Sequence, residues 1–322
     1  MSIDHSGEVS LPVQRLTARV DQADWTGRAD RFLTDQLGLI TRNQLQKRCV
    51  CLIVNGQPAK LSRTVRYHDV VEVELAAEEP SHLQPEAIPL VVIFENRDVV
   101  VINKPRGMVV HPGAGHQSGT LVNALLHHVD ELDEDDDTIR PGVVHRLDRD
   151  TSGVVICAKH TSAKEALTAQ FAARTVQKRY VALVKGSPRP AHGLIDGAIG
   201  RHRVHRQRFT VVDRGGKPAL TDYRTLRPIA GYTLMLLAPR TGRTHQLRVH
   251  MAHLGTPIVG DPVYARRDAL VPDAPLCLHA LSLALVLPGE AVPRTFTAPI
   301  PPDFRTALSA VRAVTVPGRS RG

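Results

Sequence analysis

The residues best suited to chemistry lie in the run PGVVHRLDRDTSGVVICAK, residues 141–159. Asp148 stands there between Arg146 and Arg149, and a positive neighbourhood favours the ionised form of a carboxyl group. An ionised carboxylate that is held in place is a poor general acid, but it can act as a nucleophile or as an electrostatic stabiliser. The same pattern also fits a surface turn with ion pairs, and the residues alone leave both interpretations open.

Two other sets of residues suggest different chemistry. His245, His250 and His253 could suggest a metal site, but the stretch has no H-E-x-x-H arrangement and no acidic third ligand, so we expect none. Asp150 and Asp261 could form the carboxylate pair of a glycosidase, which needs two acids about 5–10 Å apart, one with a raised pKa. Because no acid stands out in an apolar setting, such a hydrolase is a minor alternative.

Apolar runs at 143–144 and 154–156 flank the charged motif and predict two buried strands joined by a polar loop. Ser162 is expected to cap the helix that follows. Residues 178–186, KRYVALVKG, read as another strand. Thr244 can cap a further helix, which ends at Gly255.

The chain divides by composition into a small module and a larger domain. Residues 16–76 predict helices at 28–39 and after Thr41, and a hairpin that turns at Asn55-Gly56. The domain boundaries that we expect are a tail at 1–15, the module at 16–76, a proline-containing linker at 77–89, a second domain at 90–313 and a tail at 314–322.

The charge distribution favours a nucleic-acid partner. The net charge is +9, although residues 130–137 hold seven acids, so the rest of the chain is more basic still. Such a surface is typical of proteins that bind nucleic acid or an anionic membrane. No apolar run approaches the roughly 18 residues of a membrane span, and the first residues lack a signal-peptide pattern. We therefore expect a cytoplasmic protein without a membrane partner.

The run HRLDRDTSG, followed by an apolar strand ending in Ala-Lys, resembles the signature of the RluA/RluD family of RNA pseudouridine synthases. The family's N-K-P-x-G stretch precedes this run at 103–107, and its K-x-Y-x-A-L-V-x-G and T-H-Q-L-R stretches follow it at 178–186 and 244–248. Residues 16–76 resemble an S4 RNA-binding domain through R-x-D-x-F-L, V-N-G and D-V-V-E-V. They depart from it at 46–52, where Ile-x-x-Gly-x-Val is usual, and at His68, where glycine is usual.

The resemblance implies an α+β fold: a mixed, mainly antiparallel sheet flanked by helices, preceded by a small α/β S4-like domain. It implies isomerisation of uridine to pseudouridine in RNA, most often 23S ribosomal RNA, with no metal or cofactor. Asp148 would be the nucleophile, Tyr180 would face the flipped base, and Arg248 would pair with Asp148. Whether Asp148 attacks the ribose or abstracts its 2′ proton stays open.

The RNA contacts follow from the same resemblance. Arg146 would fill the place that the flipped base leaves, and Leu247 would pack beneath the base. The other expected RNA-binding residues are His145, Arg243, Arg201, Arg203, Arg206, Arg208, Arg42, Lys47 and Arg48. We expect a monomer. A non-catalytic RNA-binding or ribosome-assembly protein, and a transfer-RNA pseudouridine synthase, are the alternatives.

Overall fold

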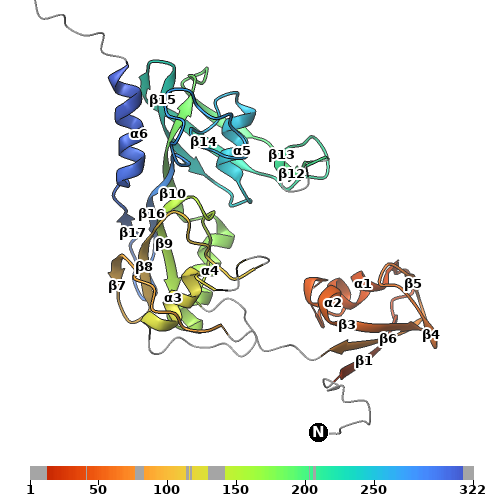
Figure 1. Ribbon diagram of the computed structural model, residues 1–322. Coiled ribbons are helices and arrows are strands. Elements are labelled where there is room, and N and C mark those ends of the chain that lie inside the picture. Colours follow the sequence, from red (N-terminus) through yellow and green to blue (C-terminus); the bar gives the residue numbers. More distant parts are fainter. Residues whose placement is uncertain are drawn as a thin grey trace, which may run out of the picture. The chain divides into compact units, whose positions relative to one another are not determined.

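The structure, a computed structural model, describes residues 13–40, 42–76, 83–113, 116, 118–129, 142–202, 204–205 and 208–314. The chain forms two compact units, Met1–His82 and Leu83–Gly322 (Figure 1). The boundary between them lies within the stretch that the sequence predicts as a linker.

The N-terminal unit is a four-stranded sheet with short helices. The sheet has the strand order β1-β6-β3-β4, and β2 pairs with β5. Asn55 and Gly56 have φ angles of 50° and 75°, which confirms the predicted hairpin turn. Its elements are β1 (Val13–Arg19), β2 (Thr26–Arg28), α1 (Ala29–Arg31), the π-helix η1 (Phe32–Gln36), α2 (Arg42–Arg48), β3 (Cys49–Val54), β4 (Gln57–Pro58), β5 (Thr64–Arg66) and β6 (Val70–Ala76).

The helix predicted at 28–39 is wrong at both ends. Arg28 belongs to β2, and its guanidinium donates two hydrogen bonds, of 2.9 and 2.7 Å, to the buried carboxylate of Asp30. After one turn of α-helix the chain widens into η1 and stops at Gln36. The helical pattern of this stretch therefore indicated a buried face, which Phe32 and Leu33 form, but not its length, since Leu37 is exposed.

The C-terminal unit is built on a nine-stranded sheet of order β11-β14-β15-β10-β16-β9-β8-β7, with β17 paired to β16. Among the described strands only β9 and β16 run parallel, which confirms a mixed, mainly antiparallel sheet. Its elements are β7 (Val92–Glu95), β8 (Val99–Lys104), α3 (Leu121–His128), β9 (Ser152–Ala158), α4 (Thr161–Ala173), β10 (Gln177–Lys185), β11 (His192–Asp196), β12 (Ile199–Arg201), β13 (Phe209–Val211), β14 (Leu220–Ile229), β15 (Tyr232–Pro239), α5 (Gln246–His253), β16 (Leu278–Leu285), β17 (Arg294–Thr297) and α6 (Pro302–Ala313).

Strand β9 is buried along its whole length because helices cover both of its faces. Val154 and Ile156 pack with Leu167 of α4. Val155, on the opposite face, packs with Leu125 of α3. Successive side chains of a strand point to opposite faces of the sheet. The continuous apolar run of β9 therefore indicates a strand that is covered on both faces.

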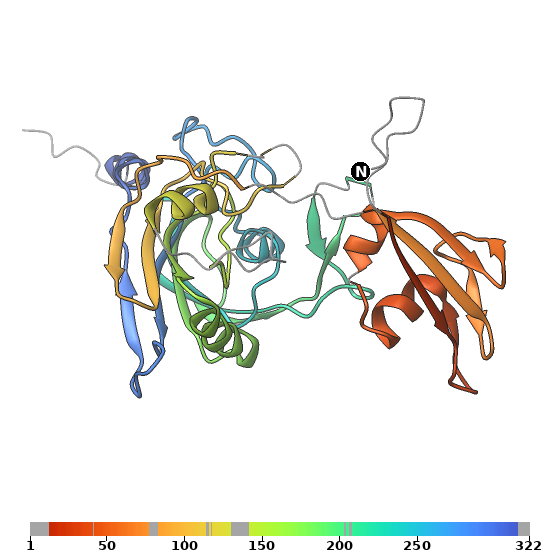
Figure 2. The same cartoon turned by 90° about the horizontal axis from the view of Figure 1, so that it is seen from below.

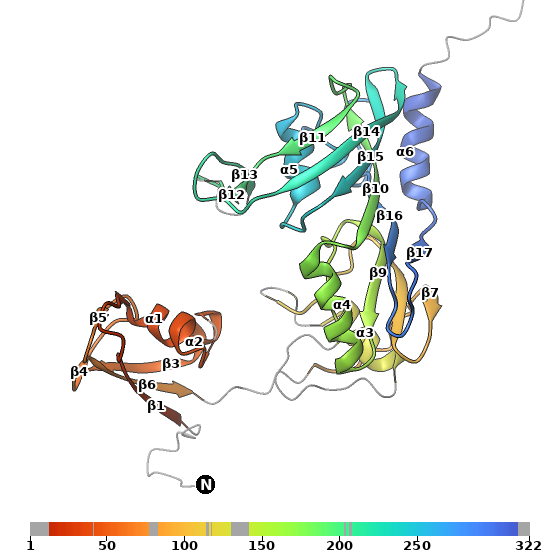
Figure 3. The same ribbon diagram turned by 180° about the vertical axis from the view of Figure 1, so that it is seen from behind.

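Farther along the sheet, α5 and α6 lie on opposite sides of it (Figures 1 and 3). Seen from below, α4 and α5 lie on the same side (Figure 2). The ribbon of β12 and β13 projects beyond the sheet on the α5 side (Figure 1). The segments that precede β9, follow α4 and precede α5 can therefore meet on one side of the sheet.

Three local predictions are corrected. Of the two strands expected around the charged motif, only the second forms, since Val143 makes a single isolated bridge to Cys157. His160 caps α4 instead of Ser162, because its Nδ1 accepts the N–H of Ala163. Helix α5 begins after His245, in the left-handed region at φ 55°, and not after a Thr244 cap.

Candidate active site

A cleft of about 500 Å³ opens in the C-terminal unit, on the side of the sheet that carries α4 and α5. It is lined by the charged motif 144–148, the end of α4, the start of β10 and the segment 239–248. Asp148, Tyr180 and Arg248, which come from three separate stretches of sequence, all line it. The predicted catalytic residues thus face one space.

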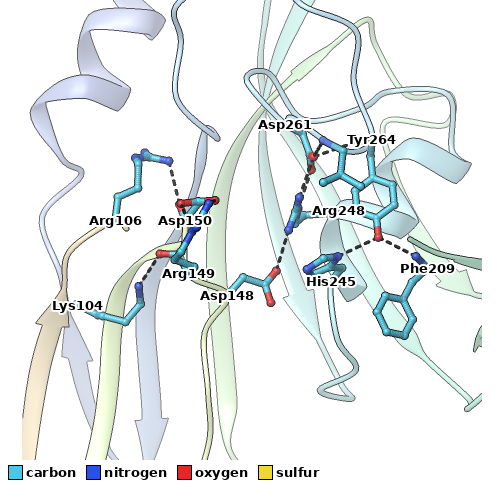
Figure 4. Close-up of polar contacts among 11 residues, drawn as sticks. Lys104, Arg106, Asp148, Arg149, Asp150, Phe209, His245, Arg248, Asp261 and Tyr264 are labelled. Carbon is cyan, nitrogen blue, oxygen red and sulfur yellow. Dashed lines mark hydrogen bonds and ion pairs between the residues drawn. The ribbon is translucent and has the colours of Figure 1, made fainter. Parts of the chain in front are cut away.

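The loop that carries Asp148 is fixed from behind by the segment after β8 (Figure 4). The Lys104 ammonium, fully buried, donates to the carbonyl oxygens of Pro105, Met108 and Arg149 at 2.8, 2.8 and 3.0 Å. Arg106 donates to the carbonyl oxygen of Asp150 at 2.9 Å. Burial lowers the pKa of Lys104 to about 7, while the three acceptors match the three N–H bonds of its charged form. The backbone on the C-terminal side of Asp148 is therefore immobilised.

Arg248 connects Asp148 to a second carboxylate that is completely buried. Its Nε and Nη2 donate to the two oxygens of Asp261 at 2.7 and 2.9 Å, and its Nη1 lies 3.4 Å from Oδ2 of Asp148. Burial alone would raise the pKa of Asp261. The bonds and charge of Arg248 and the bonds from two backbone N–H groups outweigh this effect, so the pKa lies below its usual value. Arg248 is thus held by Asp261 and presents its remaining charge to Asp148.

The opposite side of the Arg248 guanidinium rests on an aromatic ring. Its Cζ lies 5.2 Å from the ring centroid of Tyr264, a cation–π arrangement. The Tyr264 oxygen accepts the backbone N–H of Phe209, in β13, at 3.0 Å and lies 2.9 Å from Nδ1 of His245. Burial lowers the pKa of His245, so its neutral ring can accept the phenol proton. These contacts connect the β12–β13 ribbon to the cleft (Figure 4).

Tyr180 and Leu247 provide the apolar part of the cleft. Tyr180 is partly buried, and burial followed by the charge of Asp148 raises the pKa of its phenol. The hydroxyl therefore stays protonated at neutral pH. Leu247 is 6% exposed and belongs to the main hydrophobic core. Both are placed to meet a flat, uncharged ring such as a base.

His145 and Arg146 line the cleft beside Asp148 in different ways. The His145 ring stacks on Phe171 with centroids 4.7 Å apart, and its Nε2 accepts the N–H of Ile156 at 3.0 Å. Burial, then the charge of Lys178, lowers the pKa of His145 to about 3. It is a neutral wall of the cleft and brings no positive charge to RNA. Arg146 is exposed and stands at the cleft's edge.

The other predicted RNA-binding residues of the C-terminal unit lie in the cleft, on the β12–β13 ribbon or outside the described residues. Arg243 lines the cleft, and its Nε donates to the carbonyl oxygen of Pro218 at 3.1 Å. Arg201 and Arg208 are exposed on the β12–β13 ribbon, where Arg201 lies over the Phe209 ring. Arg203 and Arg206 lie outside the described residues.

The remaining predicted RNA-binding residues, Arg42, Lys47 and Arg48, belong to the N-terminal unit. Arg42 and Lys47 are exposed on α2. Arg42 also lies 3.4 Å from Asp30. Arg48 is partly buried and donates from Nε to the carbonyl oxygen of Ala76, so it also secures α2 to β6. Their contacts with RNA stay a prediction.

Two alternative chemistries lose support. Within the residues that the structure describes, no group of three His, Cys, Asp or Glu side chains is arranged to hold a metal ion. His250 is fully buried and is bonded to Thr221 and to the carbonyl oxygen of Gly197. Asp261 does not serve as a glycosidase acid, because its pKa is lowered where that role needs a raised one.

In the described part of the chain, no helix has the length and apolar character of a membrane span.

Sequence reasoning missed Lys104 and Tyr264 as site residues, and it considered Asp261 only as a glycosidase acid and not as the partner of Arg248. Lys104 was part of a quoted motif, but a lysine that is completely buried is exceptional. Asp261 and Tyr264 lie in a G-D-P-V-Y stretch whose glycine was a usable signal, since Gly260 has a φ of 73°. A glycine is needed at this turn because a Cβ would overlap backbone atoms of Pro275.

Comparison with known proteins identifies the family. A model of the RNA pseudouridylate synthase family matches residues 98–253. A ribosomal large subunit pseudouridine synthase D of Borreliella burgdorferi is 40% identical over 88% of this chain and 89% of its own length. An uncharacterized RNA pseudouridine synthase of Chloroflexus aurantiacus is 44% identical over 94% of this chain and 96% of its own.

Structural comparison agrees. The solved structure of human RNA pseudouridylate synthase domain containing 4 superimposes with a TM-score of 0.56 at 27% identity, covering 69% of this chain and 93% of that one. These matches confirm the predicted fold class and the predicted resemblance, and they leave the S4 assignment of the N-terminal unit as a prediction. The chain therefore belongs to the RluA/RluD family of RNA pseudouridine synthases, enzymes that isomerise uridine to pseudouridine in RNA.

Proposed function

We propose that this enzyme converts specific uridines of 23S ribosomal RNA to pseudouridine, with Asp148 as the nucleophile. The observation that carries the proposal is the junction of three motifs in one cleft: Arg248, fixed by Asp261, lies 3.4 Å from Asp148, with Tyr180 lining the same space. A buried guanidinium that is held by one carboxylate fixes the position of the second carboxylate, which faces the cleft.

The target uracil leaves the helical stack before chemistry begins, at a cost of a few kcal/mol. Arg146, exposed at the cleft's edge, takes the vacated place, while the base lies against Tyr180 and Leu247. Asp148 then starts the cleavage of the glycosidic bond, by attack on the ribose or by removal of its 2′ proton. Both routes begin from an ionised Asp148. The uracil turns and C5 is joined to the sugar.

Each of the remaining groups has a role that its surroundings support. Tyr180 remains a phenol, because burial and Asp148 raise its pKa, so it can give and retake a proton during the loss of the C5 hydrogen. Lys104 and Arg106 hold the loop that carries Asp148. No step in this sequence needs a metal or an organic cofactor.

The substrate class rests on the relatives. Proteins named ribosomal large subunit pseudouridine synthase D from Borreliella burgdorferi, Zymomonas mobilis and Nitrosomonas europaea are 36–40% identical to this chain. The basic S4-like unit would add further phosphate contacts through Arg42 and Lys47, which are exposed on α2. We propose that the enzyme acts in the cytoplasm, that ribosomal RNA is its partner and that it is a monomer.

The test is release of tritium from uridine labelled at C5, because isomerisation exchanges that hydrogen. Three RNA pools are compared: large-subunit ribosomal RNA, small-subunit ribosomal RNA and transfer RNA, each transcribed without modification. Release from the large-subunit RNA alone is the expected result. Release from transfer RNA instead would move the substrate to that class, and no release from any pool would contradict the proposed activity.

A further inference from the structure

The cleft contains two cations that the catalytic arrangement does not use. Lys178 and Arg174 both line it, at the start of β10 and at the end of α4. Lys178 stands two residues before Tyr180 on the same strand, and both side chains line the cleft. The rise of a strand places their Cα atoms about 6.6 Å apart. A cation at that spacing from the base-facing tyrosine lies within the span of one nucleotide.

Two other arginines of the cleft, Arg240 and Arg248, are paired with carboxylates of the protein. Arg240 makes two hydrogen bonds of 2.6 Å to Asp222, and Arg248 is held by Asp261. Lys178 and Arg174, by contrast, have no carboxylate within 4 Å among the residues that the structure describes. The Lys178 ammonium makes one long contact, 3.4 Å, to the carbonyl oxygen of Thr241.

Leaving these two charges together is unfavourable in the protein alone. Burial and then the charge of Arg174 lower the pKa of Lys178. A partly buried cation next to a like charge is stabilised by an anion that enters between them. RNA supplies one anion for every nucleotide, and guanidinium and ammonium groups are the usual side chains for binding it.

We propose that Lys178 and Arg174 form a phosphate-binding subsite that holds the RNA backbone next to the flipped uridine. This inference rests on the proposed function and adds the position of the backbone relative to Tyr180. The base would enter between Tyr180 and Leu247, and the phosphate would lie toward the end of α4. The subsite would fix the register of the nucleotide, so that the ribose is presented to Asp148 on the opposite side of the cleft.

The test uses the salt dependence of RNA binding by the full chain. In single strands, each neutralised phosphate contributes about 0.7 to the slope of log K against log salt concentration. The variants are Arg174→Gln, Lys178→Gln and the double variant. The control is Arg305→Gln, an exposed arginine on α6, across the sheet from the cleft. The RNA is a large-subunit fragment that the wild type modifies.

The double variant is expected to lose about 0.7 from the slope and to bind about tenfold more weakly at low salt, while Arg305→Gln keeps the wild-type slope. A methylphosphonate linkage beside the target uridine should reduce the wild-type slope by the same amount and leave the double variant unaffected. An unchanged slope in the double variant overturns the subsite. So does an equal loss from the methylphosphonate in both proteins.

Folding and activity are separated from this result. Arg174 is exposed, so Arg174→Gln should keep the wild-type unfolding temperature and still lower the slope by part of the 0.7. If Lys178→Gln does not fold, an unchanged slope in Arg174→Gln alone overturns the proposal. Tritium release by the wild type on the same fragment shows independently that the proposed function holds.

Discussion

At the scale of single residues, Arg248 divides its hydrogen bonds unequally between two carboxylates. The bonds to Asp261 are 2.7 and 2.9 Å, whereas the contact to Asp148 is 3.4 Å. Asp261 is fully buried, and the Asp148 side chain is 19% exposed. Arg248 is therefore anchored on its buried side, and Asp148 keeps the freedom to approach a ribose.

Replacing Asp261 with asparagine should disturb this anchoring. The amide keeps the size of the side chain, but it has only one acceptor oxygen for the two nitrogens of Arg248. The guanidinium is then no longer held in its orientation toward Asp148. We expect kcat to fall by about 100-fold, with the Kd for RNA unchanged. The control is Asp273→Asn, because Asp273 also pairs with an arginine, Arg267, but in an exposed position. Equal losses in the two variants would contradict the role of Asp261.

His145 should make the stability of the enzyme sensitive to acid. Burial lowers its pKa to about 3, against about 6.5 in an unfolded chain. Its contribution to stability is fully present above pH 6.5 and is lost as the pH falls toward 3. His145→Gln keeps an acceptor for the N–H of Ile156 but does not titrate. Between pH 7.5 and 5.5, urea denaturation should show the wild type losing up to about 1 kcal/mol more than this variant.

An equal pH dependence in the two proteins would contradict the buried neutral state of His145. The variant also separates two roles for this residue. As a neutral wall of the cleft, His145 contributes no phosphate contact, so the salt dependence of RNA binding should be the same in the variant and the wild type.

The site residues differ in how far sequence could reveal them. Asp148, Arg248 and Tyr180 were predicted through long motifs, and all three line the cleft. The Asp261–Arg248 pair was not predicted, although the two residues are only 13 positions apart. A helical arginine and a loop aspartate meet there because the chain turns at Gly260. The glycine in the sequence indicates a turn, but only the tertiary structure shows which residues the turn brings together.

At the scale of elements, the position of Asp148 depends on the strand that follows its loop. β9 lies beside β16 in the only parallel pairing of the described sheet, and Gly153 faces Ala280 there. Gly153 has a φ of 116°, and a Cβ would overlap the carbonyl oxygen of Ala280. The glycine is therefore needed both for its backbone angle and for the close approach of the strands.

Gly153→Ala is expected to destabilise the enzyme by more than about 3 kcal/mol, because backbone strain and steric overlap add at one position. Thermal unfolding measures this loss. Gly113→Ala is the matched control, since Gly113 has an ordinary φ and no neighbouring atom within 4 Å of an added Cβ. A Gly153→Ala protein as stable as that control would contradict the close pairing of β9 and β16.

Element boundaries were harder to predict than element types. Periodicity indicated β9, β10, α4 and α5, all of which form. The helix caps were wrong. His160 makes the bond expected of Ser162. The N-cap of α5 is His245, which makes no side-chain capping bond, and Gln246 in the first turn instead accepts the N–H of Arg243 and the hydroxyl proton of Thr241. The first strand expected at the charged motif is absent, and residues 143–144 contribute a single isolated bridge, from Val143 to Cys157.

At the scale of the whole molecule, the two units have separate hydrophobic cores. One core is built from residues 20–75, including Leu33, Leu45 and Leu75, and the others belong to the C-terminal unit. The isolated segment 83–322 should therefore fold cooperatively on its own and release tritium at saturating RNA. We expect weaker binding and a smaller salt slope, because Arg42 and Lys47 are lost. A truncated protein that is unfolded by circular dichroism would contradict the separation of the cores.

The central claim is that Asp148 initiates the isomerisation, and the most direct measurement compares tritium release by the wild type and Asp148→Asn. Asp150→Asn is the control, because the Asp150 side chain is paired with exposed Arg149 and is not among the residues that line the cleft. We predict that Asp148→Asn binds RNA with the wild-type Kd and releases no tritium, while Asp150→Asn stays within a few-fold of the wild type. Substantial release by a folded Asp148→Asn protein would contradict the account.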